Sequence, residues 1–322
     1  MAQCGSAPRV AREPVVKSLR QQLVDYLDVR RQFGYALTNA GRWLSHFVDY
    51  CEAQRDDVVT TELALAWATQ PTNCGAAYHA QRLSAVRGFA RYLQALDPRT
   101  TVPPMRLLSY GNQRPAPYLY SSAEVWSLVS GARDLAPELR AVTTEAILGL
   151  LFASGLRIGE ALGLDCGDVD LTEGVLTIHH SKFDRSREVP LDPTCVAALL
   201  AYERRREQLM PRATSPAFFL SDTGERVPYE RFRVDFRALV AKVPIAPPLS
   251  GHVRIHDARH TFAVNVLTRW HDEGSDVRAL MPSLSTYMGH VNPSSTYWYL
   301  SASPQLLEQA VTRLETTYEV TR

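Results

Sequence analysis

The chain has 322 residues, of which 45% are hydrophobic, and its 35 basic side chains nearly balance 34 acidic ones to leave a net charge of +1. This length and apolar content predict two domains with sizeable cores. The near-zero charge excludes a uniformly basic DNA-binding surface, so any affinity for DNA must come from local patches.

Features that would direct the chain to a membrane or an oxidising compartment are missing from its sequence. Residues 1–14, which we interpret as an N-terminal extension, lack the apolar core of a signal peptide. The longest apolar stretch, around residues 147–153, is far too short to span a bilayer. The five cysteines are odd in number and include no Cys-x-x-Cys pair, which favours reduced thiols over a disulfide framework or a zinc ribbon. We therefore expect a cytoplasmic protein without membrane partners.

Residues 15–97 have the pattern of a helical domain. Apolar residues at helical spacing, such as Leu19, Leu23 and Leu27, are typical of amphipathic helices. The predicted helices cover residues 15–33, 38–54, 60–69 and 75–96. A proline-rich segment, 98–117, interrupts this periodicity, and we interpret it as the linker to a second domain.

The second domain, 118–322, mixes helices with one short β region. Residues 175–179 and 187–191 flank a polar turn, so a small antiparallel sheet is expected with Lys182 near its tip. Helices are expected elsewhere in this domain, over 143–152, 193–209, 228–242 and from 303 onward. The sequence thus predicts a mainly α fold with a small antiparallel β-sheet.

Six residues of the second domain have the chemistry needed to cleave a phosphodiester with a tyrosine nucleophile: Arg157, Lys182, His256, Arg259, His290 and Tyr299. The attack adds negative charge to the non-bridging oxygens, which two forked guanidinium groups and two histidine rings can meet with N–H donors. A tyrosine with a pKa near 10 is only about one part in a thousand phenolate at neutral pH, so it needs this cationic site and a nearby base. A lysine can protonate the departing 5′ oxygen if neighbouring arginines lower its pKa.

The order of these residues resembles the tyrosine recombinase (phage integrase) superfamily over almost the whole chain. Ser154–Leu162 is similar to the first arginine motif of the family and carries Arg157, with Glu160 one helical turn later. Residues 255–263 are similar to the second motif, with His256 and Arg259, while Gly289-His290 and Tyr299 complete the third. The resemblance assigns the general acid to Lys182 and a supporting role to Glu160.

The resemblance implies a helical core-binding domain of the SAM-like type and a mixed α/β catalytic domain, which together clamp double-stranded DNA. It implies a site-specific recombinase or integrase that cuts and rejoins DNA through a 3′-phosphotyrosyl intermediate on Tyr299, with neither metal nor other cofactor. It also implies a synaptic tetramer on the recombination sites, with the carboxy-terminal helix docking in cis or in trans, and leaves open whether companion recombinases take part. The long segment 269–284 and the ending Tyr-Trp-Tyr-Leu-Ser-Ala-Ser-Pro resemble transposon-borne members.

Several arginines are candidate contacts for the DNA backbone. Arg82, Arg87 and Arg91 recur at intervals of five and four in the last helix of the first domain, and we expect them to face phosphates. Other arginines of the second domain could bind phosphate or form an ordinary solvated surface; these are Arg204, Arg205, Arg206, Arg226, Arg231, Arg233 and Arg237.

Alternatives stay open at three points. Tyr297 is a rival nucleophile, although it faces away from Tyr299 on a helix. His256 and His260 have a zinc-binding spacing, but Asp257 replaces the glutamate of the metalloprotease motif, so His260 is interpreted as a supporting residue. The chain could also be a type IB topoisomerase-like relaxase or a catalytically silent DNA-binding accessory protein.

Overall fold

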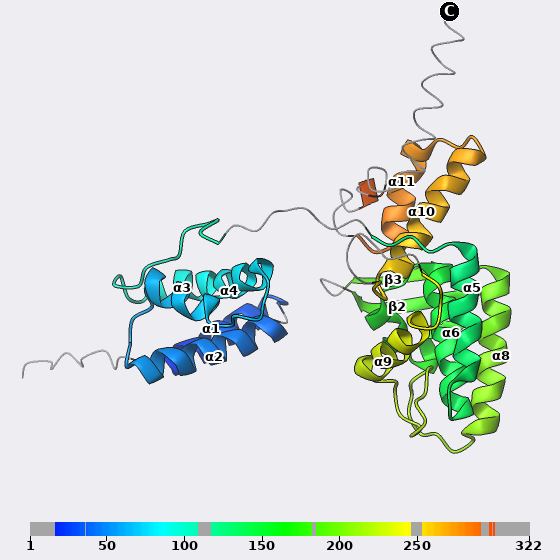
Figure 1. Cartoon of the computed structure of the whole chain (residues 1–322), viewed down its shortest axis with the longest axis horizontal. Coiled ribbons are helices and arrows are strands. Elements are labelled where there is room, and N and C mark those ends of the chain that lie inside the picture. Colours follow the sequence, from blue (N-terminus) through cyan, green and yellow to red (C-terminus); the bar gives the residue numbers. More distant parts are fainter. Residues whose placement is uncertain are drawn as a thin grey trace, which may run out of the picture. The chain divides into compact units, whose positions relative to one another are not determined.

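The computed structural model describes residues 17–35, 37–108, 117–181, 185–245, 253–290, 296, 297 and 299. The chain divides into two compact units, Met1–Gln113 and Arg114–Arg322 (Figure 1). Each unit has its own hydrophobic core, so the two are described separately. Within the described ranges, no helix has the length and apolar character needed to cross a membrane.

The amino-terminal unit contains the four expected helices, α1 (Leu19–Gln32), α2 (Thr38–Gln54), α3 (Thr61–Thr69) and α4 (Ala76–Gln94). Hydroxyl side chains cap two of them, because Ser18 accepts a hydrogen bond from the Gln21 amide and Thr60 accepts one from the Leu63 amide. Their apolar faces meet in a core that includes the ring of Phe47, which lies edge-on to Trp67.

The first part of the expected linker packs onto this unit. The Thr101 amide donates to the Val59 carbonyl at 2.9 Å. The guanidinium of Arg87 donates to the carbonyls of Pro103 and Pro104, both at 2.8 Å. Residues up to about Pro104 are therefore held by α4 and by the segment before α3, and they extend the helical unit.

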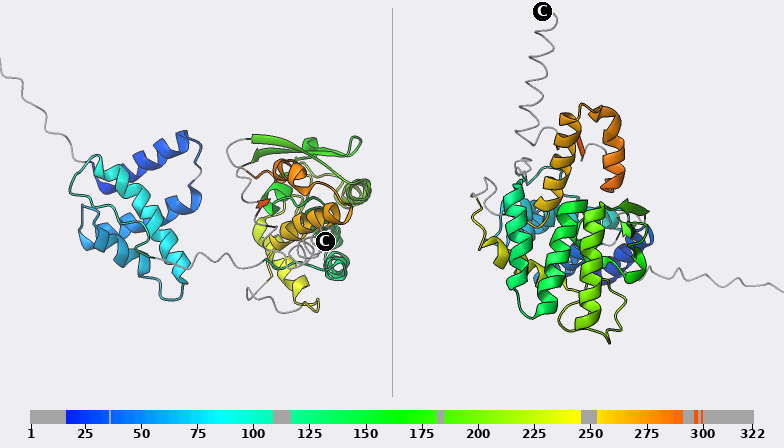
Figure 2. Two further views of the ribbon diagram at one scale, coloured as in Figure 1. Left: turned by 90° about the horizontal axis from the view of Figure 1, so that it is seen from above. Right: turned by 90° about the vertical axis from the view of Figure 1, so that its right-hand side faces the viewer.

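Most of the described helices belong to the second unit, in which α6 lies between α5 and α8 (Figure 2, right). Helix α5 begins with a capping box in which Ser121 and Glu124 bond each other's backbone amides. The helices of this unit are α5 (Ser122–Gly131), α6 (Glu138–Ser154), α7 (Ile158–Gly163), α8 (Pro193–Leu209), α9 (Tyr229–Val240), α10 (Asp257–Asp272) and α11 (Val277–Tyr287), with short 3-10 turns at Ala132–Asp134 and Cys166–Asp168.

The β region forms a three-stranded antiparallel sheet in the order β1 (Val169–Asp170), β2 (Val175–Ser181), β3 (Arg185–Pro190). Leu176 pairs with Val189, and Ile178 pairs with Arg187. The mainly α fold with a small antiparallel sheet is thus confirmed. Lys182 lies outside the described residues, as does the expected helix from residue 303.

Helix α11 is an element that the sequence did not predict. Pro282 lies inside it and removes one helical hydrogen bond. Met281 and Leu284 are nevertheless buried against Leu267 of α10, with which they form a separate small core. This apolar contact offsets the cost of the proline, and α10 and α11 lie together at one end of the unit, in orange in Figure 1.

Candidate active site

A glycine turn places the first arginine motif. Helix α6 ends at Ser154, and Gly155 follows with a φ of +62°, which a residue with a side chain rarely adopts. A Cβ atom on Gly155 would overlap with Cδ1 of Phe262 in α10. The turn therefore needs glycine for its φ angle and for its close approach to α10, and it makes Arg157 the capping residue of α7.

Arg157 is held by Glu160 and by the turn that leads to His290. Its Nη1 donates to Oε1 of Glu160 at 2.6 Å, and its amide donates to Oε2 of the same carboxylate at 3.0 Å. Its Nη2 donates to the Gly289 carbonyl at 2.9 Å. The Arg157 side chain keeps 33% of its surface exposed, so this fixed cation remains reachable from solvent.

Arg259, in the first turn of α10, is the second cation and is buried, with 2% of its surface exposed. Its Nη1 donates to the Gly155 carbonyl at 2.7 Å, and its Nη2 donates to the Met288 carbonyl. Burial, reinforced by the nearby Arg157 charge, lowers the pKa of Arg259 to about 10. The guanidinium therefore stays protonated at neutral pH.

Tyr299 is buried at 2% exposure beside α10 and α11. Its hydroxyl lies 3.1 Å from Nδ1 of His260. The His260 ring in turn lies edge-on to that of His256, with centroids 4.8 Å apart. His256 itself is exposed at the start of α10.

His290 also lies near Tyr299. Its ring is nearly parallel to that of Tyr299, with centroids 6.2 Å apart. Its Nδ1 lies 2.7 Å from the Thr296 hydroxyl. The structure thus brings Arg157, Arg259 and all three histidines into one region around Tyr299, whereas Tyr297 is 48% exposed.

Arg187 in β3 belongs to this cluster, although the sequence reasoning did not select it. Its Nη1 and Nη2 donate to the two carboxylate oxygens of Glu160 at 3.1 and 2.9 Å, and its Nε donates to the Tyr287 carbonyl at 2.9 Å. The signal that could have found it is strand alternation, because Arg187 lies two residues before the buried Val189 and so shares its inward face.

Glu160 is the acidic residue that these arginines share. Burial alone would raise the pKa of its carboxyl group, but the hydrogen bonds from Arg187 and from the Arg157 amide, together with both positive charges, lower it to about 2. Glu160 is therefore ionised at neutral pH. Its single negative charge is outnumbered by the guanidinium groups of Arg157, Arg187 and Arg259.

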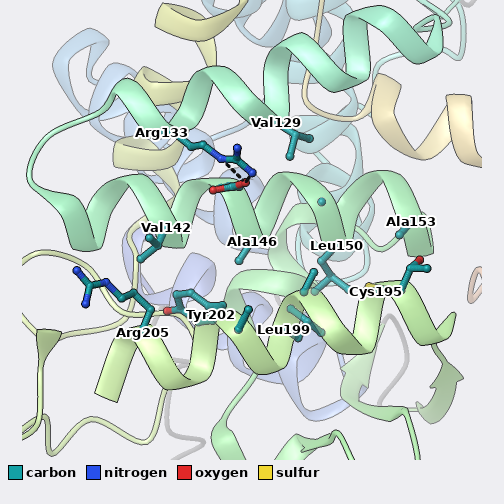
Figure 3. A pocket seen from close by; sticks show the side chains of 15 residues that line it. Val129, Arg133, Val142, Ala146, Leu150, Ala153, Cys195, Leu199, Tyr202 and Arg205 are labelled. Atoms are coloured by element: carbon teal, nitrogen blue, oxygen red, sulfur yellow. Dashed lines mark hydrogen bonds and ion pairs between the residues drawn. The ribbon is translucent and has the colours of Figure 1, made fainter. Parts of the chain in front are cut away.

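Of two hollows in the second unit, only one is lined by these residues. A cleft of about 750 Å³ is lined by Arg157 and Glu160 and also by His179, whose Nε2 lies 3.1 Å from Oδ1 of Asp168. A cavity of about 540 Å³ lies between α6 and α8, with Leu150 and Leu199 among its mostly apolar walls (Figure 3). The second cavity contains none of the predicted catalytic residues.

The three arginines expected to face DNA differ in their surroundings. Arg82 is 8% exposed, stacks 3.7 Å from the ring centroid of Trp67 and donates to the Trp67 carbonyl. Arg87 is occupied by the proline carbonyls after α4. Arg91 is exposed on α4, so among these three it has the accessibility that a phosphate contact needs.

Many arginines of the second unit are also engaged within the protein. The acidic partners of Arg205, Arg226, Arg231 and Arg233 are Glu138, Asp165, Asp222 and Glu230, respectively. Arg206 donates to the Phe218 carbonyl, whereas Arg204 and Arg237 are exposed. In the part of the chain that the structure describes, no group of three or more His, Cys, Asp or Glu residues could hold a metal ion.

Comparison with known proteins gives consistent matches. Residues 122–305 match the model of the phage integrase family. The chain is 40% identical to the protein named "Putative integrase/recombinase y4rB" of Sinorhizobium fredii, over 94% of this chain and 99% of that protein. It is 32% identical to the tyrosine recombinase XerD of Pseudomonas putida, over 90% and 91% of the two chains. The Tn1549 transposon integrase, solved in complex with transposon right end DNA, has a similar fold, with a TM-score of 0.66 and 18% identity over 93% of this chain and 99% of that one.

Proposed function

Because this chain belongs to the phage integrase family and is a tyrosine-type site-specific DNA recombinase, we propose that Tyr299 is the nucleophile with which it cleaves DNA. The observation that supports this choice most directly is the buried Tyr299 hydroxyl, 3.1 Å from His260 Nδ1 and beside the Arg259 guanidinium. A phenol in such surroundings is oriented by one hydrogen bond, and its developing phenolate is stabilised by fixed positive charge.

The proposed reaction is a transesterification that conserves the energy of the phosphodiester bond. The Tyr299 oxygen attacks the scissile phosphorus, its proton passes to a nearby base, and the bond from phosphorus to the 5′ oxygen breaks. His260 is placed to accept that proton when its Nδ1 is unprotonated. Lys182 donates a proton to the 5′ oxygen, and a 3′-phosphotyrosyl ester remains on the protein. Attack by a 5′ hydroxyl of the partner duplex then releases Tyr299.

The remaining site residues act on the charge of the phosphate. Arg157 and Arg259 bind its non-bridging oxygens, and His256 and His290 donate further hydrogen bonds as negative charge develops. Glu160 supports the arrangement by holding Arg157 through two hydrogen bonds. In this scheme the protein requires neither a metal ion nor a nucleotide cofactor.

The proposed substrate is a pair of double-stranded recombination sites, and the working assembly is a tetramer that holds both duplexes. The amino-terminal helical unit binds the DNA backbone in part through Arg91. We assign the chain to a mobile element, as a transposase-type recombinase, on the resemblance of its carboxy-terminal sequence to transposon-borne members. If this chain alone yields no recombinant DNA, we propose that companion recombinases supply the other protomers of the tetramer.

The experiment that tests this proposal is covalent trapping on nicked, labelled duplexes that carry the ends of the element encoding this protein. Wild type is compared with Tyr299→Phe and with the matched control Tyr297→Phe, all in EDTA. We expect a 3′-linked adduct with wild type and with Tyr297→Phe, and none with Tyr299→Phe. An adduct that persists in Tyr299→Phe and disappears in Tyr297→Phe would transfer the nucleophile to Tyr297.

The same protein preparations separate the proposed function from its rivals. A relaxase of the topoisomerase type would remove supercoils from plasmids that lack the element ends, whereas the proposed recombinase needs those ends. An accessory protein would bind the ends and yield no adduct in any of the three forms. Transfer of the labelled strand to a second duplex distinguishes strand exchange from simple cleavage and resealing.

A further inference from the structure

Arg187 is held more completely than an ordinary strand arginine. Only 10% of its side chain is exposed, and three of its nitrogens donate hydrogen bonds, two to Glu160 and one to the Tyr287 carbonyl. Its guanidinium also lies against the backbone of Gly289, where an added Cβ would come within 2.8 Å of its Cζ. The planar fork of arginine fits this set of acceptors, which the single ammonium of a lysine cannot bind together.

These contacts form a closed ring with those of Arg157. Arg157 binds Glu160 and the Gly289 carbonyl, while Arg187 binds the same carboxylate and contacts the same glycine. The ring therefore ties three separate parts of the sequence together: the start of α7, strand β3, and the turn between α11 and His290. Each side of the ring is a direct hydrogen bond or a van der Waals contact.

The ring also determines how much positive charge Arg157 can offer to a phosphate. With Arg157 as its only cationic partner, the Glu160 carboxylate would neutralise the positive charge of that arginine. A second cation on the same carboxylate, presented by Arg187, leaves the ring with one net positive charge. Both oxygens of Glu160 accept hydrogen bonds from Arg187, and 33% of the Arg157 side chain remains exposed to solvent.

We propose that Arg187 is a positioning residue for DNA cleavage, which acts through Glu160 and the Gly289 turn to hold Arg157 and His290 in their reactive places. It touches no reacting atom in this scheme. The inference rests on the proposed function of the site, and it adds a residue whose effect is on the geometry of the phosphate-binding groups. Arg187 does not act on protonation of the leaving group.

The test uses Arg187→Gln and Arg187→Lys in the full-length protein, with single-turnover cleavage of nicked duplexes under saturating protein. We expect both variants to cleave about 100-fold more slowly than wild type, the size of effect that a misplacement of about 1 Å can produce. Affinity for the duplex should change less than about twofold, because the buried Arg187 makes no direct DNA contact. Wild type is assayed in parallel. Absence of cleavage by wild type would count against the proposed function, whereas a defect confined to the Arg187 variants concerns the positioning role.

The matched control is Arg140→Gln. Arg140 in α6 also binds a buried carboxylate, that of Asp235, through two nitrogens. It lies in the first turn of α6, at the opposite end of the helix from Gly155. This control is expected to lose stability to a similar degree and to cleave DNA at the wild-type rate. If Arg187→Gln fails to fold, Gly289→Ala displaces the same guanidinium by a steric contact and should slow cleavage in the same way.

Two further comparisons distinguish positioning of Arg157 from other roles. A substrate with a bridging sulfur at the 5′ position needs no proton on its leaving group, so the Arg187 defect should persist on it. The double variant Arg157→Lys with Arg187→Gln should cleave no more slowly than Arg157→Lys alone. Restoration of cleavage by the sulfur substrate, multiplication of the two defects, or wild-type cleavage by Arg187→Lys would each overturn the inference.

Discussion

Glu160 should make a pH-dependent contribution to stability that can be isolated with one isosteric substitution. Glu160→Gln keeps the shape of the side chain and removes its charge, so the two arginines lose their shared anion. The folded protein lowers the pKa of this carboxyl group from 4.5 to about 2. At about 1.4 kcal/mol per pKa unit, the ionised form then contributes about 3.5 kcal/mol at pH 7. The side chain is only 10% exposed, so solvent screening reduces this figure little.

The sign of the pH dependence follows from the lowered pKa. The contribution is complete well above pH 4.5 and is lost as the pH falls from 4.5 to 2, because in this range the unfolded chain binds a proton at the Glu160 carboxyl group and the folded protein does not. At pH 3.5 roughly 2 kcal/mol should remain. The difference in unfolding free energy between wild type and Glu160→Gln should therefore narrow by about 1.5 kcal/mol between pH 7 and pH 3.5.

The assay is urea unfolding, with hydrogen exchange of peptides from α6 as the readout. This readout reports the unfolding of the second unit only. The difference between wild type and variant removes the contribution of all other carboxylates, which titrate equally in both proteins. A difference that stays constant from pH 7 to pH 3.5 would refute the reasoning. It would mean that Glu160 supports the unit by shape and packing, and that its charge is not preferentially stabilised in the folded state.

Three other substitutions test the remaining assignments. Gly155→Ala should lower the unfolding free energy of the second unit by about 2–4 kcal/mol, from the left-handed φ and the contact with Phe262; urea unfolding that matches wild type would contradict this. Arg82→Leu should cost about 2 kcal/mol in the first unit, since it removes the stacking on Trp67 and a buried hydrogen bond, and should leave DNA affinity unchanged. Arg91→Ala should leave stability unchanged and lower the affinity for DNA, and the slope of log K against log salt concentration should fall by about 1. Equal slopes for wild type and variant would show that Arg91 does not contact the DNA backbone.

The elements with strong local patterns were predictable. Helix α8 has the predicted bounds, 193–209, because Asp192 caps it and proline follows at its first position. The hairpin of β2 and β3 lies within a few residues of its predicted place, since alternating apolar residues and a polar turn mark both strands. Each motif of the site has its own local signature, which is why its residues could be selected from the sequence. Of the six predicted catalytic residues, the five that the structure describes lie in one region.

What could not be predicted depends on contacts between distant segments. Arg187 has no sequence mark that separates it from the many other arginines, and its importance appears only when β3 lies beside α11. Arg82 fits a basic helical face by spacing, but its side chain is buried because Trp67 of α3 offers both a ring and a carbonyl. Helix α11 was missed because Pro282 weakens the local pattern, and the apolar surface of α10 that stabilises it is invisible to a local analysis.

Besides the Glu160 carboxylate, main-chain oxygens anchor the arginines around Tyr299, which has a consequence for how this site can diverge. The carbonyls of Gly155, Tyr287, Met288 and Gly289 accept these hydrogen bonds. A carbonyl is present whatever side chain its residue carries, so mutations at Tyr287 or Met288 can alter the packing while the acceptors remain. The sequence can thus change around this turn while the guanidinium groups are held in the same way, provided that the backbone keeps its path and that both glycines and Glu160 stay.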